Sequence, residues 1–92
     1  MEVRLYATLR PIVGGRSVKV LDRCETIGDV LAELSAGYPE LAPHLVGDDG
    51  AVRQYVAVMV NGRDIRHLGG LDTPVDADSG IDIFPPVAGG RD

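Results

Sequence analysis

The residues best able to carry chemistry lie at the end of the sequence. Residues 84–90 read Phe-Pro-Pro-Val-Ala-Gly-Gly and follow an alternating apolar stretch. Pro85 and Pro86 stiffen the base of this tail in an extended form, and the side chains then shrink until Gly89 and Gly90 carry none. A tip of this kind can enter a narrow slot in another protein and approach a nucleotide closely. The pattern predicts that a backbone carboxyl group at the tip is the reactive group.

Two interpretations of this tail are open from the residues alone. Fully extended, Pro85 to Gly90 reaches roughly 20 Å at about 3.3 Å per residue, which suits a probe that enters a partner. The alternative is a frayed glycine-rich end. Glycine pairs also occur at 14–15 and 69–70, so a pair alone is weak evidence. The combination of strand, double proline, tapering side chains and near-terminal glycines favours the probe.

The other residues that often carry chemistry do not combine into a motif. Cys24 has no histidine near it in the sequence, so we expect a structural thiol rather than a nucleophile. His44 and His67 are isolated, are expected in loops, and lack metal-ligand spacing with Cys24. The acidic turns at 48–49 and 76–78 lack the calcium-loop pattern. Without a glycine-rich phosphate loop, the chain is not expected to hold ATP or any other cofactor by itself.

Composition and charge exclude several classes of protein. The chain has 92 residues, 45% apolar and 25% charged, which is typical of one globular domain. Its net charge is −5 and its basic residues are spread out, so nucleic acid is not an expected partner. The longest apolar run, 56–60, is too short to span a membrane, and no export signal is visible. A single cysteine fits a reducing, cytoplasmic location.

Two strands are predicted before the central helix. Val3, Leu5 and Ala7 alternate with polar residues, and a second alternation runs over 17–20. Pro11 and the glycine pair at 14–15 separate them, so they are expected to form a hairpin with a loose turn.

The helix is predicted to begin at Thr26, whose hydroxyl and the Asp29 carboxylate can form a capping box. One apolar stripe follows, made of Ile27, Val30, Leu31, Leu34 and Tyr38. Gly37 is expected at the left-handed position after the last turn, and Pro39 forbids continuation.

The second half of the chain predicts the rest of a sheet. Residues 41–50 are expected to be a connection, and 55–60 form the strongest strand. Asn61-Gly62 suits a tight hairpin turn into a short strand over 63–65, and 81–84 is the last strand. The side chains expected to face the helix are Val56, Val58, Val60, Ile81 and Ile83. We therefore predict an α+β domain over 1–84, four or five strands packed on one main helix, followed by a tail over 85–92.

The residues that alternate with this inward set predict a face for docking partners. The expected outward positions are Arg4, Tyr6, Ala57, Met59, Asp82 and Phe84. Exposed Phe, Tyr and Met side chains on one face of a small protein favour contact with a partner. Ordinary partial burial of edge aromatics is the alternative. Together with Pro85, Pro86 and Val87, the apolar members form the predicted docking patch.

Four segments of this chain, 3–10, 60–65, 71–74 and 83–90, resemble a known family. They look like the small subunit of molybdopterin synthase (MoaD), the related sulfur carriers ThiS and CysO, and the archaeal ubiquitin-like modifiers. The resemblance covers nearly the whole chain and is most specific in the tail. It implies a ubiquitin-like β-grasp fold.

The resemblance also implies a mechanism and a set of partners. An E1-like adenylating enzyme uses ATP to convert the terminal carboxylate into an acyl adenylate. Sulfur then displaces AMP, which leaves a thiocarboxylate on the last glycine. The carrier delivers this sulfur to a sulfur-accepting synthase in cofactor or cysteine biosynthesis, so it is a co-substrate or small subunit rather than an enzyme. In modifier relatives the acyl group passes to a lysine of a target protein instead.

The sequence departs from this pattern at its last two residues. Gly90 is followed by Arg91 and Asp92, so its carbonyl lies in a peptide bond. Activation at Gly90 requires cleavage before Arg91, which implies a processing peptidase. The alternatives are incidental trimming and an inactive copy.

Overall fold

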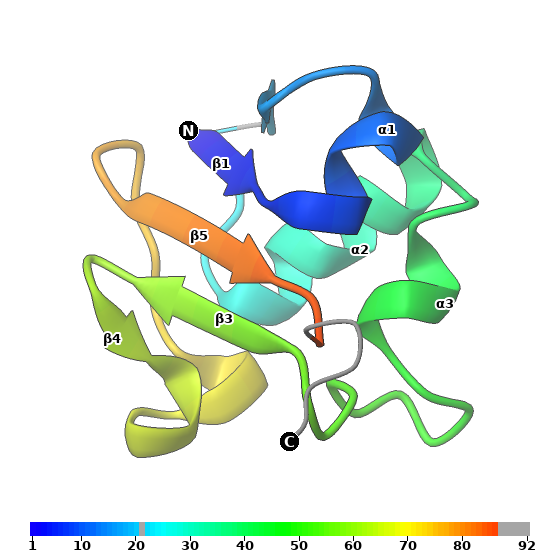
Figure 1. The fold of residues 1–92 in the computed structure, drawn as a ribbon. Helices are drawn as coiled ribbons and strands as arrows, with labels where there is room; N and C mark the ends of the chain where they lie inside the picture. Colours follow the sequence, from blue (N-terminus) through cyan, green and yellow to red (C-terminus); the bar gives the residue numbers. More distant parts are fainter. Residues whose placement is uncertain (21, 87–92) are drawn as a thin grey trace.

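The computed structural model describes residues 1–20 and 22–86 and contains a five-stranded sheet. The strands are β1 (Glu2–Leu5), β2 (Ser17–Lys19), β3 (Ala57–Val60), β4 (Arg63–Asp64) and β5 (Gly80–Phe84). Their order across the sheet is β2-β1-β5-β3-β4, and Figure 1 shows β5 between β1 and β3. The pair β1–β5 is parallel and the other pairs are antiparallel. The predicted mixed α+β architecture is confirmed.

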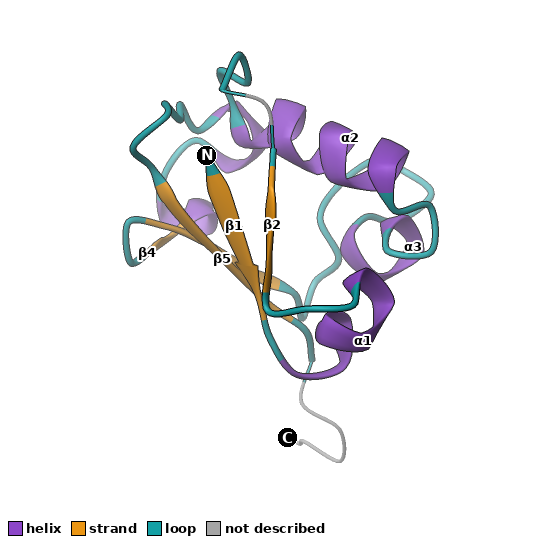
Figure 2. Cartoon of the chain, turned by 90° about the horizontal axis from the view of Figure 1, so that it is seen from above, coloured by secondary structure: helices purple, strands orange, loops and turns teal. Residues whose placement is uncertain are grey.

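The helices cover one side of this sheet. The α-helices are α1 (Arg10–Val13), α2 (Ile27–Gly37) and α3 (Ala42–Leu45), and Figure 2 shows all three on the same side. Short 3-10 turns add η1 (Ala7–Leu9), η2 (Ile65–His67) and η3 (Gly70–Asp72). In the described ranges, 1–20 and 22–86, no helix has the length and apolar character that crossing a membrane requires.

Helix α2 begins as the sequence predicts and ends differently. The Thr26 hydroxyl accepts a hydrogen bond from the Asp29 amide, and the Asp29 carboxylate accepts one from the Thr26 amide, so the capping box is complete. The prediction for Gly37 is wrong, because this glycine is the last helical residue and the chain turns extended at Tyr38 (φ −134°). The physical reason is Pro39, whose ring disfavours helical backbone in the residue before it.

The core lies between α2 and the inner face of the sheet. All five strand residues expected to face the helix are buried: Val56, Val58, Val60, Ile81 and Ile83. Four of the five predicted stripe residues of α2 are buried against them, namely Ile27, Val30, Leu31 and Leu34, and Tyr38 is partly buried. The period-2 and period-3.6 patterns therefore identified the two apolar surfaces that meet.

The hairpin between β3 and β4 follows the predicted turn chemistry. Asn61 and Gly62 both have positive φ, 52° and 84°, as a type I′ turn requires. The flanking strands are shorter than predicted, because β3 starts at Ala57 and Ile65 belongs to η2, where its side chain is buried.

Two connections contain structure that the sequence analysis did not predict. The expected loose turn after β1 is instead η1 and α1, which bury Leu9 completely. The expected connection over 41–50 contains α3, which buries Leu41 and Leu45 at its ends. Both segments close the core at the end of the sheet from which the chain leaves β5 (Figure 1).

Candidate functional site at the open face of the sheet

The tail leaves the sheet from its central strand. Phe84 is the last residue of β5 and pairs with Ala57 of β3. The chain continues through Pro85, which is half-buried, and Pro86, which is exposed. Residues 87–92 lie outside the described residues, and with them the predictions for Val87, Gly89, Gly90 and Arg91. The described structure therefore shows where the tail is anchored.

The described members of the predicted docking patch lie on one side of the sheet, next to this anchor. We use the term open face for the side of the sheet opposite the helices, formed by Arg4, Tyr6, Ala57, Met59, Asp82 and Phe84. Phe84 is 38% exposed, and its ring stacks on that of Tyr6 with centroids 4.2 Å apart and planes 13° from parallel. Ala57 and Met59 are half-buried beside them. Aromatic and apolar residues thus lie beside the point where the tail begins, with Tyr6 on the β1 side and Ala57 on the β3 side of Phe84.

One member of the open face differs from the prediction. Asp82 was expected to be exposed, but it is buried, with a side chain only 12% exposed. Arg4 forks onto its carboxylate, with Nε 2.7 Å from Oδ1 and Nη2 3.0 Å from Oδ2. The Tyr6 hydroxyl donates to the same Oδ1 at 2.8 Å. Alternation placed Asp82 on the correct face, but it could not show that two neighbours cover it.

This carboxylate changes the acid–base behaviour of its partners. The hydrogen bond to Asp82, followed by partial burial, raises the pKa of the Tyr6 hydroxyl above its ordinary value. The hydrogen bond and the negative charge of Asp82 likewise raise the pKa of Arg4. Both groups therefore keep their protons at neutral pH, and Tyr6 remains a donor to Asp82.

Arg10 also contacts the Tyr6 ring, and no sequence pattern predicted this contact. Its guanidinium carbon lies 5.2 Å from the centroid of the Tyr6 ring, within the range of a cation–π interaction. Its Nε donates to the Leu5 carbonyl oxygen at 2.9 Å. The position of Arg10 in α1 produces this contact, and α1 itself was not predicted.

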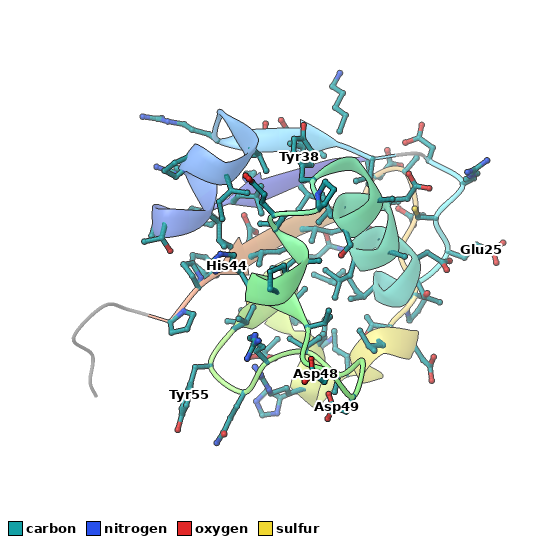
Figure 3. All side chains as sticks on the ribbon, turned by 90° about the vertical axis from the view of Figure 1, so that its right-hand side faces the viewer. Glu25, Tyr38, His44, Asp48, Asp49 and Tyr55 are labelled. Carbon is teal, nitrogen blue, oxygen red and sulfur yellow. The ribbon has the colours of Figure 1, made fainter. Side chains whose placement is uncertain are left out.

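A second surface lies on the other side of the tail anchor. Tyr55 is 73% exposed, points away from the body of the protein (Figure 3), and lines a shallow groove together with Pro86. Arg66 holds the adjoining loop by donating to the carbonyl oxygens of Arg53, Gln54 and Val56 at 2.8 to 2.9 Å. No sequence signal identified Arg66, because its partners are backbone carbonyls.

The sequence of the chain matches a known family almost from end to end. The model of the ThiS family matches residues 3–90, which is almost the whole chain and ends on Gly90. The chain belongs to the ThiS family. The resemblance expected from the sequence is confirmed, and the family is one of ubiquitin-like sulfur carriers.

Individual relatives of this ThiS-family chain carry two kinds of name. Small archaeal modifier protein 3 of Haloferax volcanii is 44% identical over 91 residues, covering 98% of each chain. Sulfur carrier protein CysO of Mycobacterium tuberculosis is 33% identical over 90 residues, covering 96% of each chain. A chain of the crystal structure of the Amycolatopsis orientalis BexX/CysO complex matches with a TM-score of 0.84 at 28% identity, covering 97% of this chain and 98% of that one. These matches confirm the ubiquitin-like β-grasp fold.

The remaining candidate residues do not gather into a site. Cys24 is buried, and burial raises the pKa of its thiol, which opposes a nucleophilic role. His44 and His67 are exposed on α3 and η2 rather than in loops, so their predicted placement is wrong. Among residues 1–20 and 22–86, no three His, Cys, Asp or Glu side chains are arranged to hold a metal ion.

Proposed function

We propose that this chain is a sulfur carrier that works as a co-substrate of partner enzymes. Its terminal Gly89-Gly90, once Arg91 and Asp92 have been removed, is adenylated, converted to a thiocarboxylate, and used to donate sulfur in cofactor or cysteine biosynthesis. The observation that carries this proposal is the family match, which ends on Gly90 and leaves the last two residues outside. A tail anchored in the central strand of the sheet supports it.

The chemistry explains why partners are needed. A carboxylate is a poor electrophile, since it is negatively charged and lacks a leaving group. In the first step a carboxylate oxygen of Gly90 bonds to the α-phosphorus of ATP, and pyrophosphate leaves. In the second, hydrosulfide attacks the carbonyl carbon, and the carbon–oxygen bond to AMP breaks. An E1-like enzyme would bind the ATP, and a peptidase would first hydrolyse the bond between Gly90 and Arg91.

The open face is the surface we assign to partner docking. Phe84, Tyr6, Met59 and Ala57 provide the apolar part, and Pro85 and Pro86 direct the tail from its edge. Aromatic side chains dominate the energy of many interfaces, because they bury large areas with little loss of side-chain entropy. The same face would serve the adenylating enzyme and the sulfur-accepting synthase in turn.

A mass measurement tests the proposal. A chain that ends at Gly90 is incubated with the activating enzyme of the same cell, ATP and sulfide. Replacement of one carboxyl oxygen by sulfur should raise its intact mass by about 16 Da, as expected for a covalent acyl intermediate captured by sulfur. The matched control is the 92-residue chain, which should keep its mass. An unchanged Gly90-ending chain, beside a second carrier that is loaded in the same assay, would contradict the proposal.

A second function is favoured by a specific observation. The 44% identity to a protein named small archaeal modifier protein 3 supports a ubiquitin-like modifier joined through Gly90 to lysines of target proteins. Peptides from the native cell that carry the Gly89-Gly90 remnant on lysine side chains would support this function. Lys19 is the one lysine in the sequence, which argues mildly against polymeric conjugates and does not argue against single additions. A thiocarboxylate without such peptides would favour the carrier.

A further inference from the structure

We infer that Asp82 is a positioning residue for the tail: by holding the Tyr6 hydroxyl, it fixes the ring that stacks on Phe84 and thereby sets the direction in which the chain leaves β5. This inference deepens the proposed function and rests on it. It concerns how the tail is aimed, whereas docking depends on the apolar surface itself.

The sheet alone does not hold Tyr6 in place. The parallel ladder between β1 and β5 ends with the pair Leu5 and Ile83, one residue before Tyr6. Tyr6 has extended backbone (φ −126°, ψ 155°) and leads into η1. Phe84 is held on the β3 side by the ladder in which it pairs with Ala57. Side-chain contacts therefore decide what touches Phe84 from the β1 side.

The Tyr6 side chain is fixed at both ends. Its ring stacks on Phe84, and its hydroxyl donates to Oδ1 of Asp82, two residues earlier on the same strand. A stacked pair can slide at little cost, because apolar contact is non-directional. A hydrogen bond at 2.8 Å prefers a narrow range of angles, so it selects one ring position.

Asp82 is itself held in one orientation. Its Oδ1 accepts from both Arg4 Nε and the Tyr6 hydroxyl, while Oδ2 accepts from Arg4 Nη2. A bidentate guanidinium–carboxylate pair has a fixed planar geometry. The order of constraint is therefore Arg4, Asp82, Tyr6 and finally Phe84, the last strand residue before the double proline.

This arrangement predicts a separation of kinetic effects. Residues that only dock the carrier should change KM, because they contribute equally before and during the reaction. A residue that aims the tail should change kcat, since adenylation needs the terminal carboxylate correctly placed against ATP. Tyr6→Phe is the sharp variant because it keeps the ring and removes only the hydroxyl.

The test measures ATP-dependent adenylation of Gly90-ending variants by the activating enzyme. Tyr6→Phe should lower kcat roughly threefold to tenfold, the loss expected for one hydrogen bond, with KM changed less than about twofold. Tyr38→Phe is the matched control, since it removes a tyrosine hydroxyl at the end of α2, and should match the wild type. A wild-type kcat for Tyr6→Phe, or a change in KM alone, would overturn the inference.

Two variants of Asp82 test the same hydrogen bond, one in a double-mutant cycle with Tyr6→Phe and one by a conservative substitution. Asp82→Ala should lower kcat as much as Tyr6→Phe, and the double variant should lose no more than either alone, because both break the same bond. Asp82→Asn keeps the oxygen that accepts from Tyr6 but places an amide donor opposite Arg4 Nη2, so it should recover only part of kcat. Additive losses in the double variant would contradict positioning through the hydroxyl.

A structural readout separates this inference from the proposed function. The ¹⁵N relaxation of the Val87 amide, the first amide beyond the two prolines, reports motion at the base of the tail without any partner. Its heteronuclear NOE should fall in Tyr6→Phe and not in Tyr38→Phe. That result with a chain that is never adenylated would sustain positioning and reject the carrier function. If the chain is adenylated efficiently while Tyr6→Phe leaves both the NOE and kcat unchanged, the carrier function stands and the positioning inference is rejected.

Discussion

The two faces of the sheet use the same strands in opposite ways. On β1 and β5 the inward residues are all apolar and fully buried: Val3, Leu5, Ile81 and Ile83. The residues that alternate with them on the open face are Arg4, Tyr6, Asp82 and Phe84, joined by an ion pair, a hydrogen bond and a ring stack. Figure 2 shows α1, α2 and α3 on the inner side of the sheet.

The difference shows how stability and positioning are divided in this domain. The inner face is stabilised by the apolar area that it removes from water, and this contribution does not depend on the direction of any single contact. The open face exposes Arg4 (55% of its side chain) and Phe84 (38%), so it contributes less burial. Its hydrogen bonds are directional, and they act next to the residue from which the tail leaves. We therefore expect variants of adjacent residues on β5 to separate the two roles.

Truncation of the inner face should give the largest effect. Ile83→Ala removes a fully buried side chain between β1, β3 and α2 and should lower the free energy of unfolding by about 2 to 5 kcal/mol. Urea unfolding followed by circular dichroism measures this loss. Asp82→Ala, one residue away, removes a carboxylate that pairs with the half-exposed Arg4 and accepts from Tyr6, and it should cost clearly less than Ile83→Ala. Equal losses would mean that the open face is also a main source of stability.

Removal of the α2 cap should give an intermediate effect confined to the inner layer. Thr26→Ala deletes the hydroxyl that accepts from the Asp29 amide and should lower the free energy of unfolding by about 1 kcal/mol. Thr8→Ala, at an exposed position in η1, is the matched control and should be nearly neutral. The two faces would prove coupled, contrary to our comparison, if the cap variant also shifted the titration of Tyr6.

Titration of Tyr6 should give the smallest effect and report on the open face alone. Asp82→Ala should lower the pKa of Tyr6 toward its ordinary value near 10, because the hydrogen bond that favours the neutral phenol is lost. The ¹³Cζ chemical shift of the tyrosine ring measures this midpoint. An unchanged midpoint would show that Asp82 does not hold the hydroxyl in solution.

The raised pKa also has a consequence for stability at high pH. A phenol that binds its proton more tightly in the folded state stabilises that state fully below the unfolded pKa, near 10. The contribution is lost as pH rises from there through the higher folded value. Asp82→Ala should therefore make stability less dependent on pH in this range, and urea midpoints at successive pH values would show it.

Much of the fold could be predicted because its signals are local. Thr26 and Asp29 are three residues apart and form their capping box within one turn. Asn61 and Gly62 adopt positive φ through their own intrinsic preferences. Alternation over 56–60 and 81–83 identified the buried face of each strand, because the side-chain period of a strand is two.

The errors fall where tertiary contacts override local pattern. The segments that became η1, α1 and α3 are short and weakly helical in sequence, and they are held by burial of Leu9, Leu41 and Leu45. Those three elements depend on packing that no window of sequence contains. Gly37 is a different kind of error, because the Tyr38–Pro39 step that ends the helix after it is local.

The candidate site was found only in part for the same reason. The composition of the tail predicted a reactive end, and strand alternation predicted that Phe84 and Met59 face outward. Asp82, by contrast, was assigned to the right face with the wrong exposure, and Arg10 was missed. The contacts that Asp82 and Arg10 make come from other elements, so they are absent from the local pattern.

By itself the sequence determined the apolar faces, the α2 cap, the Asn-Gly turn and a tapering end with two terminal glycines before Arg91. Tertiary structure decided which side chains meet beside that end. Tyr6 and Asp82 are 76 residues apart, and they touch because β1 and β5 pair in parallel with Arg4 opposite Asp82. The register of two strands so distant in the chain is set by the burial of their inner residues in one core, which is a property of the whole fold.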